Sequence, residues 1–199
     1  MFRFVYKLIA GLFFKLYLKK VQGLKNLPEP PFILAFEHHS FIDPPLLISI
    51  LPARMLKQIK FLAEKGLFSL KGRNFFVSFF AKRFALPTNG GVDRAVAAFK
   101  VFPKLVLLVS PLVYSLKRKK PKTGTGVAVI AKESKIPVVP VIISGTDKIW
   151  PIGGRLRGVR KFKSIKINIG KPIMPDRKIS KEAFTKKILQ AMRNLVCDE

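Results

Sequence analysis

Residues 32–51, FILAFEHHSFIDPPLLISIL, hold the pattern that decides the fold. The first five letters are an apolar run after a proline-rich segment, and such a run predicts a short buried strand. A helix-like apolar segment follows at Leu46–Leu51. Pro44 and Pro45 stand where this helix would begin, because proline is tolerated in a first helical turn. The stretch therefore predicts a strand, a polar turn and a helix in succession.

Apolar runs and helix-like segments alternate along the rest of the chain. Further strands are predicted at Lys60–Ala63, Leu105–Val109, Pro137–Ser144 and Ile165–Ile169. Helices are predicted at Phe75–Phe84, Asp93–Lys100, Thr125–Glu133 and Ser180–Val196. The segments between them are predicted to be a loop or short helix at Glu64–Phe68, a turn at Leu86–Gly91 and a basic loop at Lys117–Lys122. Asp93 and Ser180 are candidate N-caps, and Pro140 indicates an edge strand or a special bend. The alternation indicates a single α/β domain without repeats or linkers.

The polar turn holds the only two histidines of the chain, His38 and His39. His38 and Asp43, with Ser40 between them, suggest a base and its orienting carboxylate, because a neutral imidazole can accept a proton near pH 7 and a carboxylate on its other nitrogen fixes the tautomer. The alternative is a surface histidine beside a helix-capping aspartate.

Composition restricts the possible partners and cofactors. The 199 residues carry a formal net charge of +27, and such a surface favours an anionic partner, either nucleic acid or acidic phospholipid. One cysteine, Cys197, excludes a disulfide framework and a cysteine-rich metal site, and is typical of a reducing compartment. Two adjacent histidines do not make a zinc site, so we expect neither a metal nor another cofactor.

The N-terminal segment favours lipid as the anionic partner. Residues 1–18 are mostly apolar, but Arg3, Lys7 and Lys15 interrupt them too often for a transmembrane helix, and no signal-peptide cleavage site follows. We expect residues 1–20 to form a helix in the membrane interface, with its cations reaching the headgroups, and residues 21–199 to form the main domain. The protein would then be peripheral or monotopic on the cytoplasmic face. The alternative is a buried N-terminal helix with solvated lysines.

Three segments resemble the glycerolipid (lysophospholipid) acyltransferase superfamily, and most of all the 1-acyl-sn-glycerol-3-phosphate acyltransferases. The lead-in Val21–Pro28 is similar to that family's. Residues 38–43 resemble its Asn-His-x-Ser-x-x-Asp block, with Glu37 in place of the usual Asn, and residues 136–145 resemble its fourth block. The resemblance covers roughly residues 18–175 and implies a mixed central sheet flanked by helices.

The resemblance also implies an activity, which is the transfer of a fatty acyl group from acyl-CoA or acyl carrier protein to a lysophospholipid hydroxyl. The acceptor would be a lipid such as 1-acyl-glycerol-3-phosphate, in phospholipid biosynthesis. His38 would be the general base, and Asp43 would orient and polarise it. Ser40 would support the turn and, with Arg94, contribute to substrate binding. An acyl-chain tunnel near Phe75–Phe84 is a further expectation, against the alternative that these aromatics are core.

Two family blocks are altered in this chain. Where the third block, Phe-Pro-Glu-Gly-Thr-Arg, is expected, residues 110–115 are SPLVYS, and the second block lacks its final Arg before Gly90. One explanation is an acceptor site rebuilt from Arg94 and the lysine run 117–120, although a solvated loop is the favoured interpretation of that run. The other is a compensated frameshift over roughly residues 101–116, which resequencing of the gene would test.

Two rival functions remain from the sequence. The charge alone would suit a nucleic-acid-binding protein, but the chain has no helix-turn-helix or RNA-recognition signature, so we expect no nucleic-acid partner. The altered third block would suit a catalytically impaired or inactive family member that binds lipid. An acyl-transfer assay separates the enzyme from both alternatives.

Overall fold

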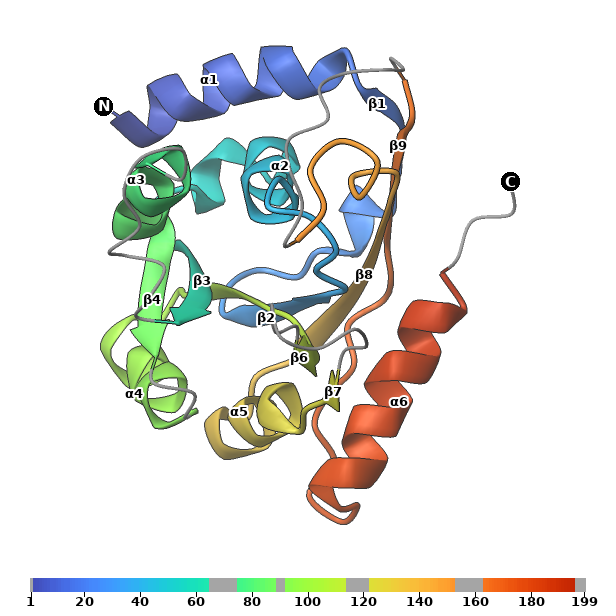
Figure 1. The fold of residues 1–199 in the computed structure, drawn as a ribbon. Coiled ribbons are helices and arrows are strands. Elements are labelled where there is room, and N and C mark those ends of the chain that lie inside the picture. The colour runs from blue at the N-terminus through green and yellow to red at the C-terminus, as the bar shows by residue number, and fades with distance from the viewer. Residues whose placement is uncertain (1, 65–74, 89–91, 114–121, 153–162, 196–199) are drawn as a thin grey trace.

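A seven-stranded sheet lies at the centre of the computed structural model (Figure 1), in the order β1-β9-β8-β2-β5-β3-β4. The structure describes residues 2–64, 75–88, 92–113, 122–152 and 163–195. The strands are β1 (Leu18–Gln22), β2 (Phe32–Phe36), β3 (Ile59–Glu64), β4 (Ala85–Thr88), β5 (Val106–Val109), β8 (Val138–Ser144) and β9 (Ile165–Ile169). A separate antiparallel pair, β6 (Leu112–Val113) and β7 (Lys122–Thr123), follows β5.

The sheet is mixed, as the resemblance implied. β8, β2, β5, β3 and β4 are parallel neighbours, whereas β9 runs antiparallel to β8 and pairs in parallel with β1. The predicted strands at residues 32–36 and 165–169 have the expected bounds, and the other three are confirmed within one residue at either end. The single α/β domain predicted from the alternating pattern is therefore confirmed.

Helices cover both faces of the sheet (Figure 1). α1 (Phe2–Lys15), α2 (Asp43–Ile50) and α3 (Phe75–Phe84) lie on one face, and α4 (Asp93–Val101), α5 (Gly126–Ser134) and α6 (Lys181–Arg193) lie on the other. Two short 3-10 turns, Leu24–Asn26 and Ala53–Met55, complete the described helical structure. Ser180 caps α6 as predicted, since its side chain accepts the N–H of Ala183 at 3.1 Å.

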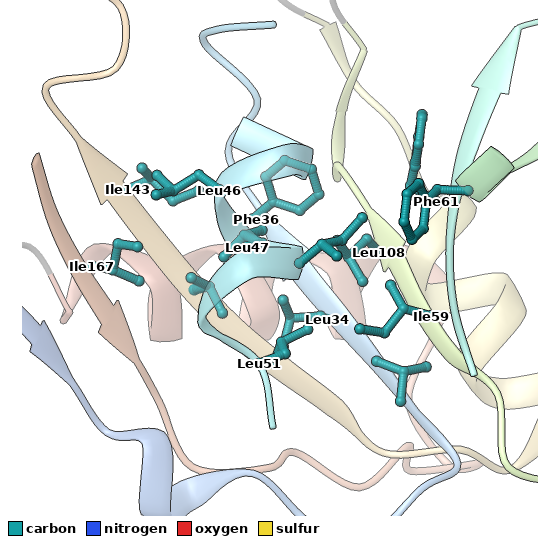
Figure 2. Packing of buried hydrophobic residues seen from close by; sticks show 14 of the residues in the cluster. Leu34, Phe36, Leu46, Leu47, Leu51, Ile59, Phe61, Leu108, Ile143 and Ile167 are labelled. Carbon is teal, nitrogen blue, oxygen red and sulfur yellow. The ribbon is translucent and has the colours of Figure 1, made fainter. Parts of the chain in front are cut away.

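The central strand β2 sends alternate side chains into two separate cores. Leu34 and Phe36 face α1, α2 and α3, while Ile33 and Ala35 face α4, α5 and α6. Figure 2 shows the first core, where Leu47 on α2 packs over β2. A strand buried on both faces needs apolar residues at every position, which explains why its sequence is a continuous apolar run.

The carboxyl ends of β2 and β5 mark the point where the connections diverge to opposite faces of the sheet. The chain leaves β2 toward the face that carries α2, whereas after β5 it reaches α5 on the opposite face. Neighbouring parallel strands whose connections diverge in this way leave a crevice beyond their carboxyl ends, where ligands bind in open α/β sheets. Residues 37–43 follow β2 at this point.

Helix α1 differs from the expected interface helix in length and in the direction of its cations. It ends at Lys15, and residues 18–20 belong to the edge strand β1. Arg3 donates to the carbonyl oxygens of Leu56, Lys57 and Arg83, and Lys7 donates to those of Ser49 and Leu51. These two cations therefore point into the protein, because they satisfy carbonyl groups at the ends of α2 and α3 and just after the 3-10 turn Ala53–Met55.

Two local predictions are wrong. Residues 86–88 form the end of β4 rather than a turn, because they pair in parallel with residues 62–64 of β3. The N-cap of α4 is Val92, so Asp93 is the first helical residue and makes no side-chain cap. The remaining residues of the predicted turn, 89–91, lie outside the described part of the chain, as do residues 65–68 and 117–121 of the predicted loops.

Pro140 lies in an interior strand, not at an edge, since β8 stands between β9 and β2. Its carbonyl oxygen accepts the N–H of Gly170 at 2.8 Å, on the side of β9. Pro140 stands opposite Gly170, just before the first paired residues Val141 and Ile169 of the β8–β9 ladder, so its missing N–H costs only the reciprocal bond of this terminal pair. The interior position is tolerated for this reason.

Candidate active site

We call residues 37–43 the catalytic turn, after the role that the sequence predicts for them, and this turn brings His38 and Asp43 together at the carboxyl end of β2. His38 Nδ1 lies 3.2 Å from Asp43 Oδ2. Asp43 is fully buried, whereas the His38 side chain is 27% exposed, so the outer edge of the imidazole reaches solvent. The ring also packs edge-on against Phe36, with 5.6 Å between the ring centroids. Asp43 contacts the Nδ1 side of the imidazole, which leaves Nε2 as the nitrogen that can accept a proton.

The Asp43 carboxylate folds back over the turn instead of capping the helix that it begins. Its Oδ2 accepts the backbone N–H groups of His39 at 2.8 Å and Ser40 at 2.7 Å. The N-cap position of α2 is Ile42, and no side chain caps this helix. The alternative of a helix-capping aspartate is therefore wrong. One oxygen instead orders the backbone of the turn and accepts the Nδ1–H of His38.

Ser40 is buried and its hydroxyl is engaged on both sides. Its Oγ donates to the carbonyl oxygen of Trp150 and accepts the N–H of Ile42 at 3.3 Å. A hydroxyl that is held in this way supports the turn and is not presented as a nucleophile. The geometry therefore agrees with the supporting role expected for Ser40, and gives no evidence for a direct contact with substrate.

Helix α2 offers no free backbone N–H at its N-terminus. Pro44 and Pro45 carry no N–H, and the amides of Asp43 and Leu46 donate to Ser40 O and Ile42 O. An anion at this helix end would be attracted by the helix dipole, but no backbone N–H of the first turn would donate a hydrogen bond to it. Donors outside the first turn of α2 must therefore stabilise an oxyanion at this site.

Comparisons with known proteins show what the segment around the turn is similar to. Residues 19–101 match the family model described as Acyltransferase. A chloroplastic 1-acyl-sn-glycerol-3-phosphate acyltransferase of Brassica napus is 27% identical over 85% of this chain and 49% of its own, and one of Saccharomyces cerevisiae is 29% identical over 74% and 48%. Over most of its length the chain is therefore similar to 1-acyl-sn-glycerol-3-phosphate acyltransferases. It spans about half the length of the curated relatives that it matches.

The fold is that of a solved relative. The crystal structure of the 1-acyl-sn-glycerophosphate acyltransferase PlsC from Thermotoga maritima superposes with a TM-score of 0.69, covering 97% of this chain and 78% of that one at 21% identity. This likeness establishes the acyltransferase fold for nearly the whole chain. The catalytic turn lies inside the segment that the family model matches.

Glu37, which replaces the usual asparagine of these acyltransferases, forms a second pair beside the first. Glu37 Oε2 lies 2.9 Å from His39 Nε2. The hydrogen bond that His39 makes to the Glu37 carboxylate raises the pKa of His39, and burial lowers it. The charges of Glu37, Asp43 and Asp147 add to the increase, so the pKa is raised overall. The turn thus carries a buried carboxylate behind His38 and a half-buried imidazole–carboxylate pair next to it.

Arg94 does not reach the catalytic turn. It lies in the first turn of α4, beyond β4, and donates to Pro87 O at 3.3 Å. β4 is three places from β2 in the sheet, which separates the two strand ends by roughly 14 Å. The structure therefore does not bring Arg94 together with His38 and Asp43. Its substrate-binding role stays a prediction, and the lysine run 117–120 lies outside the described residues.

The position of the third acyltransferase block is occupied by a small hairpin. Ser110 Oγ accepts the N–H of Leu112 at 3.2 Å and donates to its carbonyl oxygen at 2.8 Å. Gly124 N–H donates to Pro111 O at 2.9 Å, which closes β6 against β7. Residues 110–113 contribute no charged side chain at the edge of the crevice where the family block has Glu and Arg.

The aromatic segment 75–84 contributes to the core in the part that the structure describes. Phe80 stacks on Phe61, with 5.5 Å between centroids, and lies 4.8 Å from Phe84. Both rings pack against Tyr6 of α1. The side chains of residues 75–78 lie outside the description, and the tunnel stays a prediction.

Sequence reasoning missed the residues that hold the catalytic turn from the outside. Residues 146–152 follow β8 and bond to residues 39–41, more than one hundred positions earlier in the chain. No spacing could indicate this contact. The only available signal was that Trp150 is the single tryptophan of the chain. In the described residues, no group of three His, Cys, Asp or Glu side chains is placed to hold a metal ion.

Proposed function

We propose that this protein transfers a fatty acyl group from a thioester, acyl-CoA or acyl carrier protein, to the hydroxyl of a lysophospholipid such as 1-acyl-glycerol-3-phosphate. The contact of His38 with Asp43 at the carboxyl end of β2 carries this proposal. The named activity of the relatives supports the choice of substrate class.

The proposed chemistry needs one base and no covalent enzyme intermediate. Asp43 accepts the Nδ1–H of His38, and Nε2 takes the proton from the acceptor hydroxyl as its oxygen attacks the thioester carbon. The tetrahedral intermediate then collapses, the carbon–sulfur bond breaks, and the imidazolium returns the proton to the leaving thiolate. The products are an ester and a free thiol. A positioned base of this kind contributes about 10²–10⁴-fold to the rate.

The outer face of α1 supports membrane association of the same domain. Six apolar side chains on this helix and its end are between 44% and 64% exposed, namely Val5, Leu8, Ile9, Leu12, Phe13 and Leu16. Arg3, Tyr6, Lys7, Ala10, Phe14 and Tyr17 lie on the inner side. No helix in the described residues is long and apolar enough to span a bilayer. We therefore infer that α1 lies flat in the membrane interface with its apolar face in lipid.

The distribution of charge supports an anionic membrane surface. Residues 1–28 hold six Lys or Arg and residues 148–175 hold eight, and neither segment contains an Asp or Glu. β1 and β9, which belong to these segments, pair at the sheet edge beside the end of α1, with Lys20 opposite Lys166. Like charges opposite one another destabilise a sheet, so an anionic surface would relieve them. We propose a peripheral or monotopic location on the cytoplasmic face.

The test measures acyl transfer with purified protein on anionic vesicles. Lysophosphatidic acid is the acceptor, acyl-CoA and acyl carrier protein thioesters are compared as donors, and free thiol and diacyl product are both quantified. We expect product from wild type, a loss of about 10²–10⁴-fold in His38→Ala, and a much smaller loss in the matched variant His39→Ala. Equal rates in wild type and His38→Ala would refute the assigned base.

The altered third block makes a lipid-binding protein without transferase activity an alternative, and the same assay has a distinct result for it. If wild type binds the vesicles but releases no thiol with either donor, the protein is a lipid-binding member without transferase activity. Retention on DNA in the same salt, with no lipid binding, would instead favour the nucleic-acid alternative.

A further inference from the structure

We propose that residues 146–152 form a strap that positions the catalytic turn, with Trp150 as the positioning residue at its centre. The role in catalysis rests on the proposed acyl transfer, but the mechanical role of the strap does not. The strap acts through the turn, not by touching substrate.

Four contacts join the strap to residues 39–41. The carbonyl oxygen of Trp150 accepts both the Ser40 hydroxyl and the backbone N–H of Phe41, the latter at 3.2 Å. Ile152 N–H donates to His39 O at 3.0 Å, and this bond together with that of Phe41 makes Ser40 and Pro151 an isolated antiparallel bridge. The indole of Trp150 packs on the Phe41 ring, with 5.5 Å between centroids. The strap thus pairs with the turn like a short extra strand.

The strap is itself held in one conformation. It begins after Gly145, whose φ of +92° favours glycine and where a Cβ would lie 2.5 Å from Ser164 O. Thr146 is buried, and its carbonyl oxygen accepts the N–H groups of Ile149 at 3.0 Å and Trp150 at 3.1 Å. The turn formed by residues 146–150 therefore presents the Trp150 carbonyl without needing a ligand to order it.

The turn is consequently held from two sides. Asp43 binds the N–H groups of His39 and Ser40 from the protein interior, while Trp150 and Ile152 bind Ser40, Phe41 and His39 from the outside. His38 lies at the start of this clamped segment, and its contact with Asp43 requires the turn to keep its shape. A small displacement of a base from its reactive geometry can lower a rate by about 10²-fold.

The first experiment does not depend on catalysis. Amide hydrogen exchange of the full chain is compared between wild type, Trp150→Ala, Trp150→Phe and Phe184→Leu. Phe184 is fully buried between α6 and the sheet, away from the turn. Phe184→Leu is therefore the control for a general loss of stability that does not involve the turn. We expect exchange at the amides of residues 39–43 to rise at least about tenfold in Trp150→Ala, beyond any global increase, and to recover in Trp150→Phe. Unchanged exchange at these amides in Trp150→Ala would overturn Trp150 as the residue that positions the turn.

The second experiment separates positioning from mere folding. In the acyl-transfer assay, Trp150→Ala should lower kcat by about 10–10²-fold with KM for both substrates nearly unchanged, and Trp150→Phe should restore most of kcat. Phe184→Leu should lower the midpoint of unfolding but leave kcat per folded molecule unchanged. If wild type makes no product, the proposed function fails and the exchange result alone decides the strap. An active wild type with kcat unchanged in Trp150→Ala would refute positioning.

Discussion

The phenolic hydroxyl of Tyr6 donates a hydrogen bond to the carbonyl oxygen of Pro45 over 3.1 Å, which joins α1 to the first turn of the helix that begins with Asp43. The same ring lies 5.4 Å from Phe80 and 5.3 Å from Phe84, between centroids. Burial raises the pKa of Tyr6 well above its usual range, so the phenol stays a neutral donor. The helix whose outer face we assign to lipid is therefore bonded directly to the helix that begins with Asp43.

This bond predicts a graded effect of substitutions at Tyr6. Tyr6→Phe keeps the ring contacts and loses one hydrogen bond, so we expect the free energy of unfolding to fall by about 0.5–1.5 kcal/mol. Tyr6→Ala also removes the ring, and we expect about 3–5 kcal/mol. Urea unfolding followed by circular dichroism measures both. Equal losses in the two variants would show that the hydroxyl contributes everything and the packing nothing.

Lys7 and Lys15 of α1 should differ in what is lost when their charge is removed, which is stability for Lys7 and vesicle binding for Lys15. Lys7 Nζ donates to Ser49 O and Leu51 O, so Lys7→Met should lower the free energy of unfolding in lipid-free buffer by about 1.5–3 kcal/mol. Lys15 is exposed, and Lys15→Met should leave stability within about 0.5 kcal/mol while weakening binding to anionic vesicles by about 1 kcal/mol. Thermal unfolding and vesicle co-sedimentation measure the two quantities. A stable Lys7→Met with weakened vesicle binding would reverse the assignment.

The inward cations show where reasoning from sequence stops. Positions 3, 7, 10, 14 and 17 share one helical face by their spacing, and the spacing is visible in the sequence. Which face turns inward is decided by what the helix packs on, here carbonyl groups at the ends of α2 and α3. The usual assumption that cations face outward therefore failed for Arg3 and Lys7.

The strands show the same limit in another form. β2, β5 and β8 were predictable because strands covered on both faces must be apolar throughout. β1 and β4 were not, since an edge strand needs only one apolar face and a short strand can resemble a turn. The pairing of His38 with Asp43 is local and was predictable, whereas the strap reaches the turn only through the fold.

Glu37 and His39 should make stability depend on pH in a defined direction. Because the folded state raises the pKa of His39, the pair stabilises fully below the unfolded value of about 6.5 and loses this contribution as the pH rises through the folded value. Glu37→Gln should therefore lower the melting temperature at about pH 6, and match wild type well above the folded pKa. The difference should not exceed about 2–4 °C, since both groups are partly exposed. A difference that grows toward alkaline pH would contradict the assignment.

Trp150 offers a fluorescent probe of the catalytic turn, because it is the only tryptophan of the chain and its ring packs on Phe41. In His38→Ala, which should bind acceptor without consuming it, lysophosphatidic acid should reduce quenching of Trp150 by acrylamide. The matched control is the same titration with Trp150→Phe, which should show no tryptophan signal. Unchanged quenching at an acceptor concentration that saturates the wild-type rate would place the acceptor away from the turn.

Asp43 allows the charge of the carboxylate to be separated from its hydrogen bonds. Its Oδ2 accepts His38, His39 and Ser40, while Oδ1 is buried and has no hydrogen-bond partner among the described residues. In Asp43→Asn the amide oxygen can replace Oδ2 and the NH₂ group can take the place of Oδ1, so the turn keeps its acceptor but loses the negative charge.

We therefore expect Asp43→Asn to stay folded and to lose about 10–10²-fold in kcat, because a hydrogen bond to a charged group contributes about 1.5–3 kcal/mol and the imidazolium would lose that partner. Asp43→Ala also leaves the two buried N–H groups without an acceptor, and should lower the free energy of unfolding by about 1–3 kcal/mol for each. Steady-state acyl transfer and urea unfolding of both variants provide the measurements. If Asp43→Asn keeps the wild-type kcat, the Asp43 carboxylate only shapes the turn, and His38 acts as a base without help from the negative charge of Asp43.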